Sequence, residues 1–217
     1  MAPTSAPGRS PHRPAREDVS TIAAQPRTAT GSSSVSSSSR RSEAARLAVL
    51  NAADDLLVEH GFEGLTIEGI AAAAGVAKQT IYRWWKSKVD ILFDNLVLDA
   101  GTALAWPADP SGPADLRAYV HRFAAFLGTE PAGRVLQALL GHAQLDARTA
   151  ELLHTGFLDG LRDRDVAQTR AALGGSEDEA AVLLDALLAP LYHRALVLRR
   201  PLDPAFVDAL LDQHLAH

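Results

Sequence analysis

Cysteine is absent from this 217-residue chain, and its absence excludes several kinds of chemistry. Without thiols the protein can have no disulfide framework, no thiolate metal site and no cysteine nucleophile. Motifs of other enzyme classes are missing as well, namely a nucleophile elbow, a phosphate-binding glycine loop and paired catalytic acids. The eight histidines include no pair spaced four residues apart, the spacing that places two imidazoles on one helix face. We therefore expect no enzyme activity, no cofactor and no metal.

Long apolar runs are also lacking. Charged residues break the apolar stretches every few positions, well short of the roughly 20 residues that a helix needs to span a bilayer. The first residues have no basic start followed by an apolar block, so a secretory signal is not expected. The sequence predicts a soluble, cytoplasmic protein without a membrane partner.

The net charge of −5 is distributed unevenly along the chain. Residues 1–41 carry a charge of +4, residues 42–88 carry −1, and residues 89–217 carry −8. Residues 1–41 are rich in serine and poor in apolar residues, so we expect a disordered basic arm. Arg40 and Arg41 lie at its end and are predicted to meet DNA, although an inert extension is an open alternative.

The stretch Leu65–Lys88 has the pattern of two short helices joined by a tight turn. Thr66 is a suitable N-cap, because its hydroxyl can accept a hydrogen bond from a free N–H of the first turn. Gly75 can adopt the left-handed conformation that ends a helix. Apolar residues recur between them at three- and four-residue spacing and predict one buried face: Ile67, Ile70, Ala71 and Ala74.

The second helix of this pair is predicted to run from about Lys78 to Trp85. Ile81 and Trp85 are four residues apart and form its buried face. Lys78, Gln79 and Tyr82 lie elsewhere on the helix; lysine can donate to guanine or phosphate, and glutamine can pair with adenine. This arrangement is typical of the reading helix in a helix-turn-helix, and the alternative is a helical hairpin with a solvated polar face.

The residues from Ala45 to about Leu92, and above all the string IAAAAGVAKQTIYRWWKSK, resemble the DNA-binding signature of the tetracycline-repressor (TetR) family of bacterial transcription regulators. The resemblance implies DNA backbone contacts from Thr66, Tyr82, Trp84 and Lys88. It implies base contacts from three further residues, Lys78, Gln79 and Thr80. Ala77 departs from the family pattern of serine or threonine, so a helix cap and a phosphate contact are expected to be missing.

The rest of the chain reads as helices without a strand signal, and the predicted fold is all-α. A helix from Ser42 to His60 completes a three-helix DNA-binding domain over residues 42–88. Residues 89–217 are predicted to form a ligand-binding and dimerisation domain. Its expected helices begin at Lys88, Ala114, Pro131, Ala147 and Ser176 and after Pro204, with a kink at Pro190.

Two features of this second domain suggest how it works. The last two helices are apolar on several sides, which fits either internal burial or a subunit interface. The TetR resemblance implies the interface, and hence a homodimer. An apolar ligand cavity is expected between the connecting helix and the next three helices, lined by Leu98, Trp106, Phe123, Phe126, Leu136, Leu140 and Phe157, with His121 and His142 as polar groups.

The sequence and the resemblance together predict a ligand-responsive repressor that binds a palindromic DNA operator. Its partners would be double-stranded DNA, a small-molecule effector and a second copy of the chain. The alternatives are a ligand-independent regulator and a helical protein-interaction module.

Overall fold

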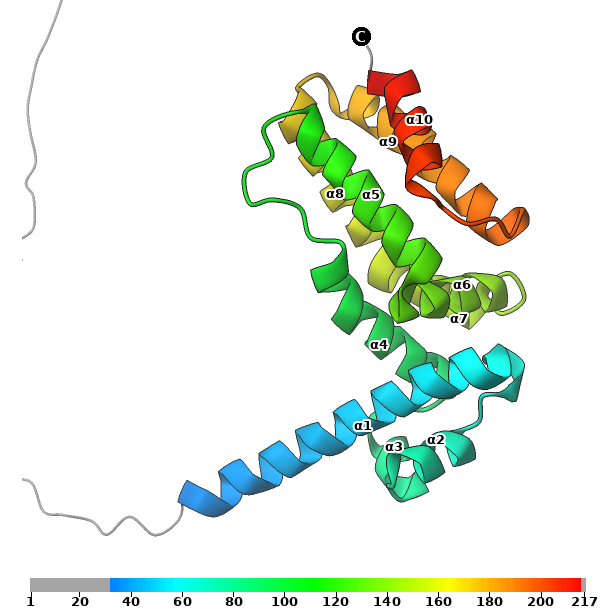
Figure 1. The fold of residues 1–217 in the computed structure, drawn as a ribbon. Helices are drawn as coiled ribbons and strands as arrows, with labels where there is room; N and C mark the ends of the chain where they lie inside the picture. Colours follow the sequence, from blue (N-terminus) through cyan, green and yellow to red (C-terminus); the bar gives the residue numbers. More distant parts are fainter. Residues whose placement is uncertain (1–31, 216–217) are drawn as a thin grey trace, which may run out of the picture. The chain divides into compact units, whose positions relative to one another are not determined.

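The computed structural model describes residues 32–215, with side chains from residue 40 onward. The described residues form helices and no strand, which confirms the predicted all-α class. Residues 1–31, which make up most of the predicted basic arm, lie outside the described residues. In the following we refer to helices α1–α3 as the head and to helices α5–α10 as the body, with α4 connecting them (Figure 1).

Helix α1 spans Ser32–Gly64 and begins well before the predicted start at Ser42. Extending an existing helix costs little, because each added residue gains one backbone hydrogen bond, and serine is only a moderately poor helix former. A serine-rich segment attached to a stable helix can therefore continue it. The predicted end near Gly61 has a structural counterpart, since Gly61 has non-helical angles (φ 70°, ψ 177°) and divides α1 into two helical segments.

Helices α2 (Ile67–Ala74) and α3 (Lys78–Trp84) form the predicted helix-turn-helix beside α1 (Figure 1). Thr66 caps α2, because its Oγ1 accepts a hydrogen bond from the backbone N–H of Gly69 at 3.1 Å. Gly75 ends α2 in the left-handed conformation with φ 66°. Ala77 precedes α3 without a side-chain cap, as the sequence predicted. The two residues that define the turn were thus identified correctly.

The connecting helix and the body follow in chain order. The predicted helix Ala147–Leu173 is observed as two α-helices joined by a π-helical turn, η1, and a second π-helical turn, η2, follows the helix that contains Pro190. The observed elements are α4 (Lys88–Ala103), α5 (Pro113–Thr129), α6 (Pro131–Ala143), α7 (Ala147–Leu153), η1 (His154–Leu158), α8 (Asp159–Leu173), α9 (Glu177–Tyr192), η2 (His193–Val197) and α10 (Pro204–Leu215).

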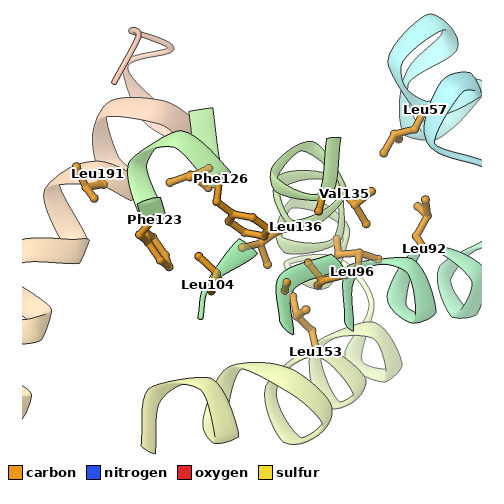
Figure 2. Close-up of a cluster of buried hydrophobic side chains, with 14 of the residues drawn as sticks. Leu57, Leu92, Leu96, Leu104, Phe123, Phe126, Val135, Leu136, Leu153 and Leu191 are labelled. Atoms are coloured by element: carbon orange, nitrogen blue, oxygen red, sulfur yellow. The ribbon is translucent and has the colours of Figure 1, made fainter. Parts of the chain in front are cut away.

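One continuous apolar core connects the head to the body through α4. Figure 2 shows Leu57 of α1 and Leu92 of α4 at one end, and Phe123 of α5 and Leu191 of α9 at the other. Helix α6 packs closely on both α4 and α5. Gly133 allows the approach to α5, because a Cβ at that position would lie 1.8 Å from the carbonyl oxygen of Phe126. The position of the head therefore depends on packing between α4 and α6.

Helix α9 leaves an apolar surface uncovered in the single chain. Val182 is 70% exposed, and Val197, in the adjoining turn η2, is 68% exposed. The segment Glu177–Val197 is long and apolar enough to cross a membrane, judged by length and composition alone. This corrects the expectation that no segment reaches that length, because the helix continues through Pro190 and joins two apolar stretches.

Candidate nucleic-acid interface and ligand cavity

Helix α3 presents the side chains that the sequence assigned to DNA. Ile81 and Trp85 are buried against the head, whereas Lys78, Gln79 and Tyr82 are exposed. The other two predicted contacts on this helix, Thr80 and Trp84, are half-buried. The order of buried and exposed positions along α3 is the one that its spacing predicted, while contact with DNA stays a prediction for each of these residues.

Lys78 is not a free cation in this structure. Its ammonium group forms an ion pair with Glu68 on α2, and it lies 5.8 Å from the centre of the Tyr82 ring. The hydrogen bond to Lys78 lowers the pKa of Glu68 below its usual value. If Lys78 contacts DNA as predicted, the Glu68 carboxylate would compete with DNA for the same ammonium group. The sequence pattern did not indicate this pair, because the two residues belong to different helices.

Glu68→Gln should increase DNA affinity several-fold. The substitution removes one negative charge from the predicted interface and releases Lys78 for its predicted base contact. If the released Lys78 also neutralises a phosphate, the slope of log affinity against log salt should steepen by about 0.9. Fluorescence anisotropy with a labelled duplex over a series of salt concentrations measures both quantities. Glu63→Gln, at an exposed position after α1 bends, is the matched control for the loss of a negative charge. Equal affinity for Glu68→Gln and the wild type would mean that the pair does not compete with DNA.

Lys88, a predicted phosphate contact, is the first residue of α4 and is bound to the end of α1. Its Nζ donates a hydrogen bond to the Phe62 carbonyl oxygen at 2.6 Å and lies 4.2 Å from the centre of the Phe62 ring. The Phe62 ring in turn packs on His142 of α6, with 4.5 Å between ring centroids. Lys88 thus connects the start of α4 to the end of α1, and His142 lies at this junction. The contact of Lys88 with a DNA phosphate remains a prediction.

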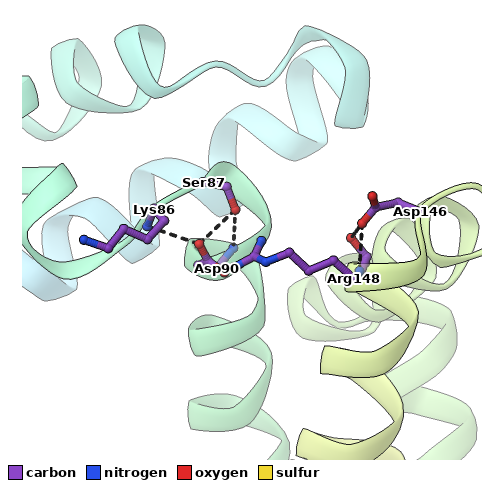
Figure 3. Close-up of polar contacts among 6 residues, drawn as sticks. Lys86, Ser87, Asp90, Asp146 and Arg148 are labelled. Atoms are coloured by element: carbon purple, nitrogen blue, oxygen red, sulfur yellow. Dashed lines mark hydrogen bonds and ion pairs between the residues drawn. The ribbon is translucent and has the colours of Figure 1, made fainter.

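A second connection joins the head to the body through Asp90, near the start of α4 (Figure 3). The Asp90 carboxylate accepts hydrogen bonds from Ser87 Oγ at 2.9 Å and from the backbone N–H of Lys86 at 3.1 Å. Arg148 of α7 binds its other oxygen at 2.7 Å. Asp94, one turn further along α4, accepts from Trp85 Nε1 at 3.0 Å and from Arg46 of α1 at 2.7 Å. Two carboxylates on α4 therefore orient the end of the reading helix.

Asp54 of α1 faces α4, and one of its two carboxylate oxygens, Oδ1, is buried without a hydrogen-bond partner in the described part of the chain. Burial raises the pKa of Asp54 to about 6, the Asn95 side chain opposes that rise, and the carboxylates of Asp99 and Asp55 add to it. The folded protein therefore binds a proton at Asp54 more tightly than the unfolded chain does. Between about pH 4 and pH 6 its stability should fall as the pH rises.

Asp54→Asn should raise the free energy of unfolding by about 1–2 kcal/mol at pH 7.5. A shift of about two pKa units corresponds to roughly 2.7 kcal/mol, and we reduce this figure because the side chain is only half-buried and water screens its charge. The gain should disappear below about pH 4, where Asp54 is protonated in both states. Urea unfolding at several pH values tests this. Glu63→Gln, which removes an exposed carboxylate of α1 that does not act on Asp54, serves as the control. A gain that persists at pH 4 would contradict the assignment.

Arg40 and Arg41, the remaining predicted DNA contacts, are exposed residues of α1. The sequence placed them at the end of a disordered arm, whereas they lie on a helix in the structure. A helical position fixes the direction of each side chain relative to the head. Their contact with DNA stays a prediction.

A cavity of about 490 Å³ opens among α5, α6, η1, α8 and α9 of the body. Apolar side chains form most of its wall, and Tyr192, Asp165, His154 and the Arg162–Asp185 ion pair supply polar groups. Both π-helical turns contribute to the lining, through His154 and Leu158 in η1 and through Leu196 in η2. Such turns often occur at functional sites, because the extra residue redirects the side chains that follow it.

The predicted lining residues are divided among several places. Phe123 and Leu140 line this cavity, whereas Phe126 and Leu136 are fully buried in the core. Leu98 on α4 is 46% exposed. The other predicted aromatic and histidine residues do not line the 490 Å³ cavity. Phe157 borders a smaller cavity beside α4, and Trp106 packs on Tyr119. His121 pairs with Asp208 at 2.8 Å, and His142 packs on Phe62. Ligand binding by these residues stays a prediction.

Sequence reasoning missed the buried carboxylate at the cavity wall. Asp165 is 1% exposed, and its oxygens accept hydrogen bonds from Trp106 Nε1 at 3.1 Å and from the hydroxyl of Tyr119. Arg164 binds it at 2.7 Å. Burial raises the pKa of Asp165, and burial together with the nearby carboxylate raises that of Tyr119. The sequence gives no sign that Asp165 is buried, because α8 is rich in polar residues. Its partner Tyr119 lies on α5, and its partner Trp106 lies in the segment before α5.

Within residues 32–215, no group of three or more histidine or acidic side chains is close enough to hold a metal ion. The two candidate sites described above are the exposed face of α3 and the cavity with polar and apolar walls in the body.

Family models and known protein sequences match both parts of the chain. Residues 49–94 match the family model described as bacterial regulatory proteins of the tetR family, and residues 110–214 match the tetracyclin repressor-like C-terminal domain. The HTH-type transcriptional regulator YdeS of Bacillus subtilis (strain 168) is 31% identical over 175 residues, which cover 79% of this chain and 88% of that protein.

Two further relatives agree. The HTH-type transcriptional repressor SCO4008 of Streptomyces coelicolor is 29% identical over 154 residues, covering 70% of this chain and 73% of that one. The crystal structure of the TetR family transcription regulator SCO0332 is 33% identical, covers 78% of this chain and 95% of that chain, and superposes with a TM-score of 0.61. The chain therefore belongs to the TetR family of helix-turn-helix transcription regulators.

Proposed function

We propose that the protein is a repressor that binds a palindromic operator as a homodimer in the cytoplasm and releases it when a small molecule binds the body. The observation that carries the proposal is the division of α3 into a buried face, Ile81 and Trp85, and an exposed face with Lys78, Gln79 and Tyr82. One chain presents a single reading helix, so two chains are needed to read two half-sites. The repressor SCO4008 supports the direction of regulation.

The proposed DNA contacts follow from position on the head. Gln79 and Lys78 are the first residues of α3 and would reach base edges in the major groove, as the N-terminal residues of reading helices do. Thr80 would add a base contact beside them. Tyr82, Trp84, Thr66 and Lys88 would bind the DNA backbone, and Arg40 and Arg41 would add charge from α1.

The proposed dimer interface lies on α9 and α10. Val182, Ala186 and Ala189 follow one another along α9 at three- and four-residue spacing, and Ala205 and Ala209 of α10 are exposed. Small side chains allow two helix pairs to approach closely and form a four-helix bundle. A two-fold interface of this kind is self-complementary. Only 22% of the apolar window in Glu177–Val197 is buried in the single chain, so a second copy would cover what the body leaves open.

The proposed effector site is the cavity of about 490 Å³ lined by Phe123, Leu140 and Tyr192. A cavity of this size suits a small organic molecule. A ligand there touches α6, which packs on α4, so a shift of α6 would move the connecting helix and the spacing of the two reading helices. The ligand needs to favour only one of two dimer conformations to release the operator. The competing proposal is a regulator that lacks ligand control.

Selection of bound duplexes from a random pool tests the DNA-binding part of this function. A near-palindromic consensus with half-sites about one helical turn apart is expected. An asymmetric consensus, or retention of random DNA without enrichment, would contradict it. Screening small molecules for release of the selected operator then tests the ligand response, with Phe123→Ala as the variant expected to lose that response while still binding DNA.

A further inference from the structure

A second and larger hollow, of about 940 Å³, lies where the end of α1, helix α6 and the segment between η2 and α10 meet. Leu57 and Phe62 of α1 form one apolar wall, and Leu196 and Leu202 form another. Three arginines, Arg134, Arg199 and Arg200, also line it. No aspartate or glutamate is among its lining residues in the described chain. We refer to this hollow as the arginine cavity.

The three arginines differ from most of the other arginines in the body. Five body arginines each bind a carboxylate, namely Arg117, Arg148, Arg162, Arg164 and Arg194. Arg134, Arg199 and Arg200 have no carboxylate within 4.0 Å among residues 40–215, and all three are exposed. Residues 89–217 carry a net charge of −8. The three arginines therefore give this hollow a positive charge within a domain whose net charge is negative.

The backbone at Arg199 supports a functional role for this segment. Arg199 has φ 51°, and it is the one non-glycine residue with positive φ among the described residues. A residue other than glycine is strained in the left-handed region, and such strain concentrates at functional positions. The surrounding segment is fixed by a hydrogen bond from the Arg200 N–H to the Arg194 carbonyl oxygen at 3.0 Å and by one from Arg194 Nε to the Pro201 carbonyl oxygen at 2.8 Å. The segment thus holds Arg199 and Arg200 beside the apolar walls.

We propose that the arginine cavity binds an amphiphilic anion, a molecule with one carboxylate, sulfonate or phosphate group and an apolar body. Guanidinium groups bind such oxygens through paired hydrogen bonds, and no carboxylate of the cavity competes for them. The leucine and phenylalanine walls would take the apolar body. This is a different site from the proposed effector cavity, and only Leu140 and Leu196 line both.

The position of the arginine cavity gives its occupant a route to the head. Phe62 borders the cavity, accepts the hydrogen bond of Lys88 through its carbonyl oxygen, and packs on His142 of α6. An anion held by Arg134 and Arg200 against Phe62 would therefore hold α1, α6 and the segment before α10 in one arrangement. Binding at this site should change the affinity for DNA, because it acts on the junction between the head and the body.

Two fluorescent probes that differ in charge test the site on the full-length chain. 8-Anilinonaphthalene-1-sulfonate carries the anion and the apolar body, and N-phenyl-1-naphthylamine is its neutral counterpart. In the variant Arg134→Gln/Arg200→Gln the affinity for the sulfonate should fall at least tenfold, while binding of the neutral probe stays unchanged. Arg122→Gln, an exposed arginine of α5 outside the cavity, should change neither. Circular dichroism melting confirms that each variant is folded.

Unchanged sulfonate affinity in the double variant would overturn the proposal, because the anion would then bind elsewhere. An equal loss for both probes would also overturn it, since the arginines would then matter for shape and not for charge. Phe123→Ala separates this site from the effector cavity, and sulfonate binding should survive that substitution. The outcome does not depend on the repressor proposal, because neither probe experiment requires DNA.

Discussion

Replacing Val182 by glutamate is expected to convert the proposed dimer into a monomer and to weaken operator binding at least 100-fold. Val182 is 70% exposed in the single chain and is the first residue of the row Val182, Ala186 and Ala189 along α9. In a two-fold interface each substitution occurs twice, so two unpaired carboxylates would be buried near each other. The acidic residues that begin α9, Glu177, Asp178 and Glu179, add to the repulsion.

The loss of DNA affinity follows from the geometry of a palindrome. In a dimer the second reading helix binds at a high effective concentration once the first is bound, and a monomer loses this advantage. Multi-angle light scattering gives the mass, and fluorescence anisotropy gives the affinity. Leu145→Glu is the matched control, because Leu145 is 89% exposed and belongs to the segment between α6 and α7, not to α9 or α10. A Val182→Glu protein that retains the dimer mass would remove this face from consideration.

The local chemistry of the head could be predicted from the sequence because it depends on neighbours in the chain. Thr66 and Gly75 fix the ends of α2, and the four-residue spacing of Ile81 and Trp85 fixes the buried face of α3. The start of α1 could not be predicted, since the serine-rich segment has no strong stop signal before Ser42. Leu98 was predicted to line the ligand cavity, but the buried face of α4 passes through Asn95 and Leu96 and leaves Leu98 exposed.

The contacts that join distant parts of the chain gave no sequence signal. Lys88 has the residue type and position of a phosphate contact, and its observed partner, the Phe62 carbonyl oxygen, lies 26 residues away. Asp165 could be recognised as buried only after α5 and α8 were placed together, because its partners are Trp106 and Tyr119. The π-helical turns redirect the side chains of α7–α8 and α9, so a regular helical period does not predict which residues line the cavity.

Gln79→Ala is expected to weaken binding to the selected operator by about 1–3 kcal/mol and to broaden the base preference at one position of each half-site. Gln79 is exposed and is the second residue of α3, whose N-terminus is the part of a reading helix that reaches base edges. A glutamine amide can donate to adenine N7 and accept from adenine N6 at the same time, and alanine can do neither. Duplex selection with the wild type and the variant, followed by anisotropy on the best sequence of each, measures both effects.

Tyr82→Phe is the control that separates loss of a base contact from loss of a DNA-backbone contact. Tyr82 is 43% exposed one turn further along α3, and its hydroxyl is expected to bind a phosphate, which carries no base information. Its loss should weaken binding to all duplexes alike and leave the selected consensus unchanged. Lys88→Ala would be a poorer control, because Lys88 also connects α4 to Phe62 and its removal would disturb the head itself. If Gln79→Ala selects the same consensus as the wild type with the same stringency, the specific contact must come from Lys78 or Thr80, and Gln79 would have no part in reading the operator.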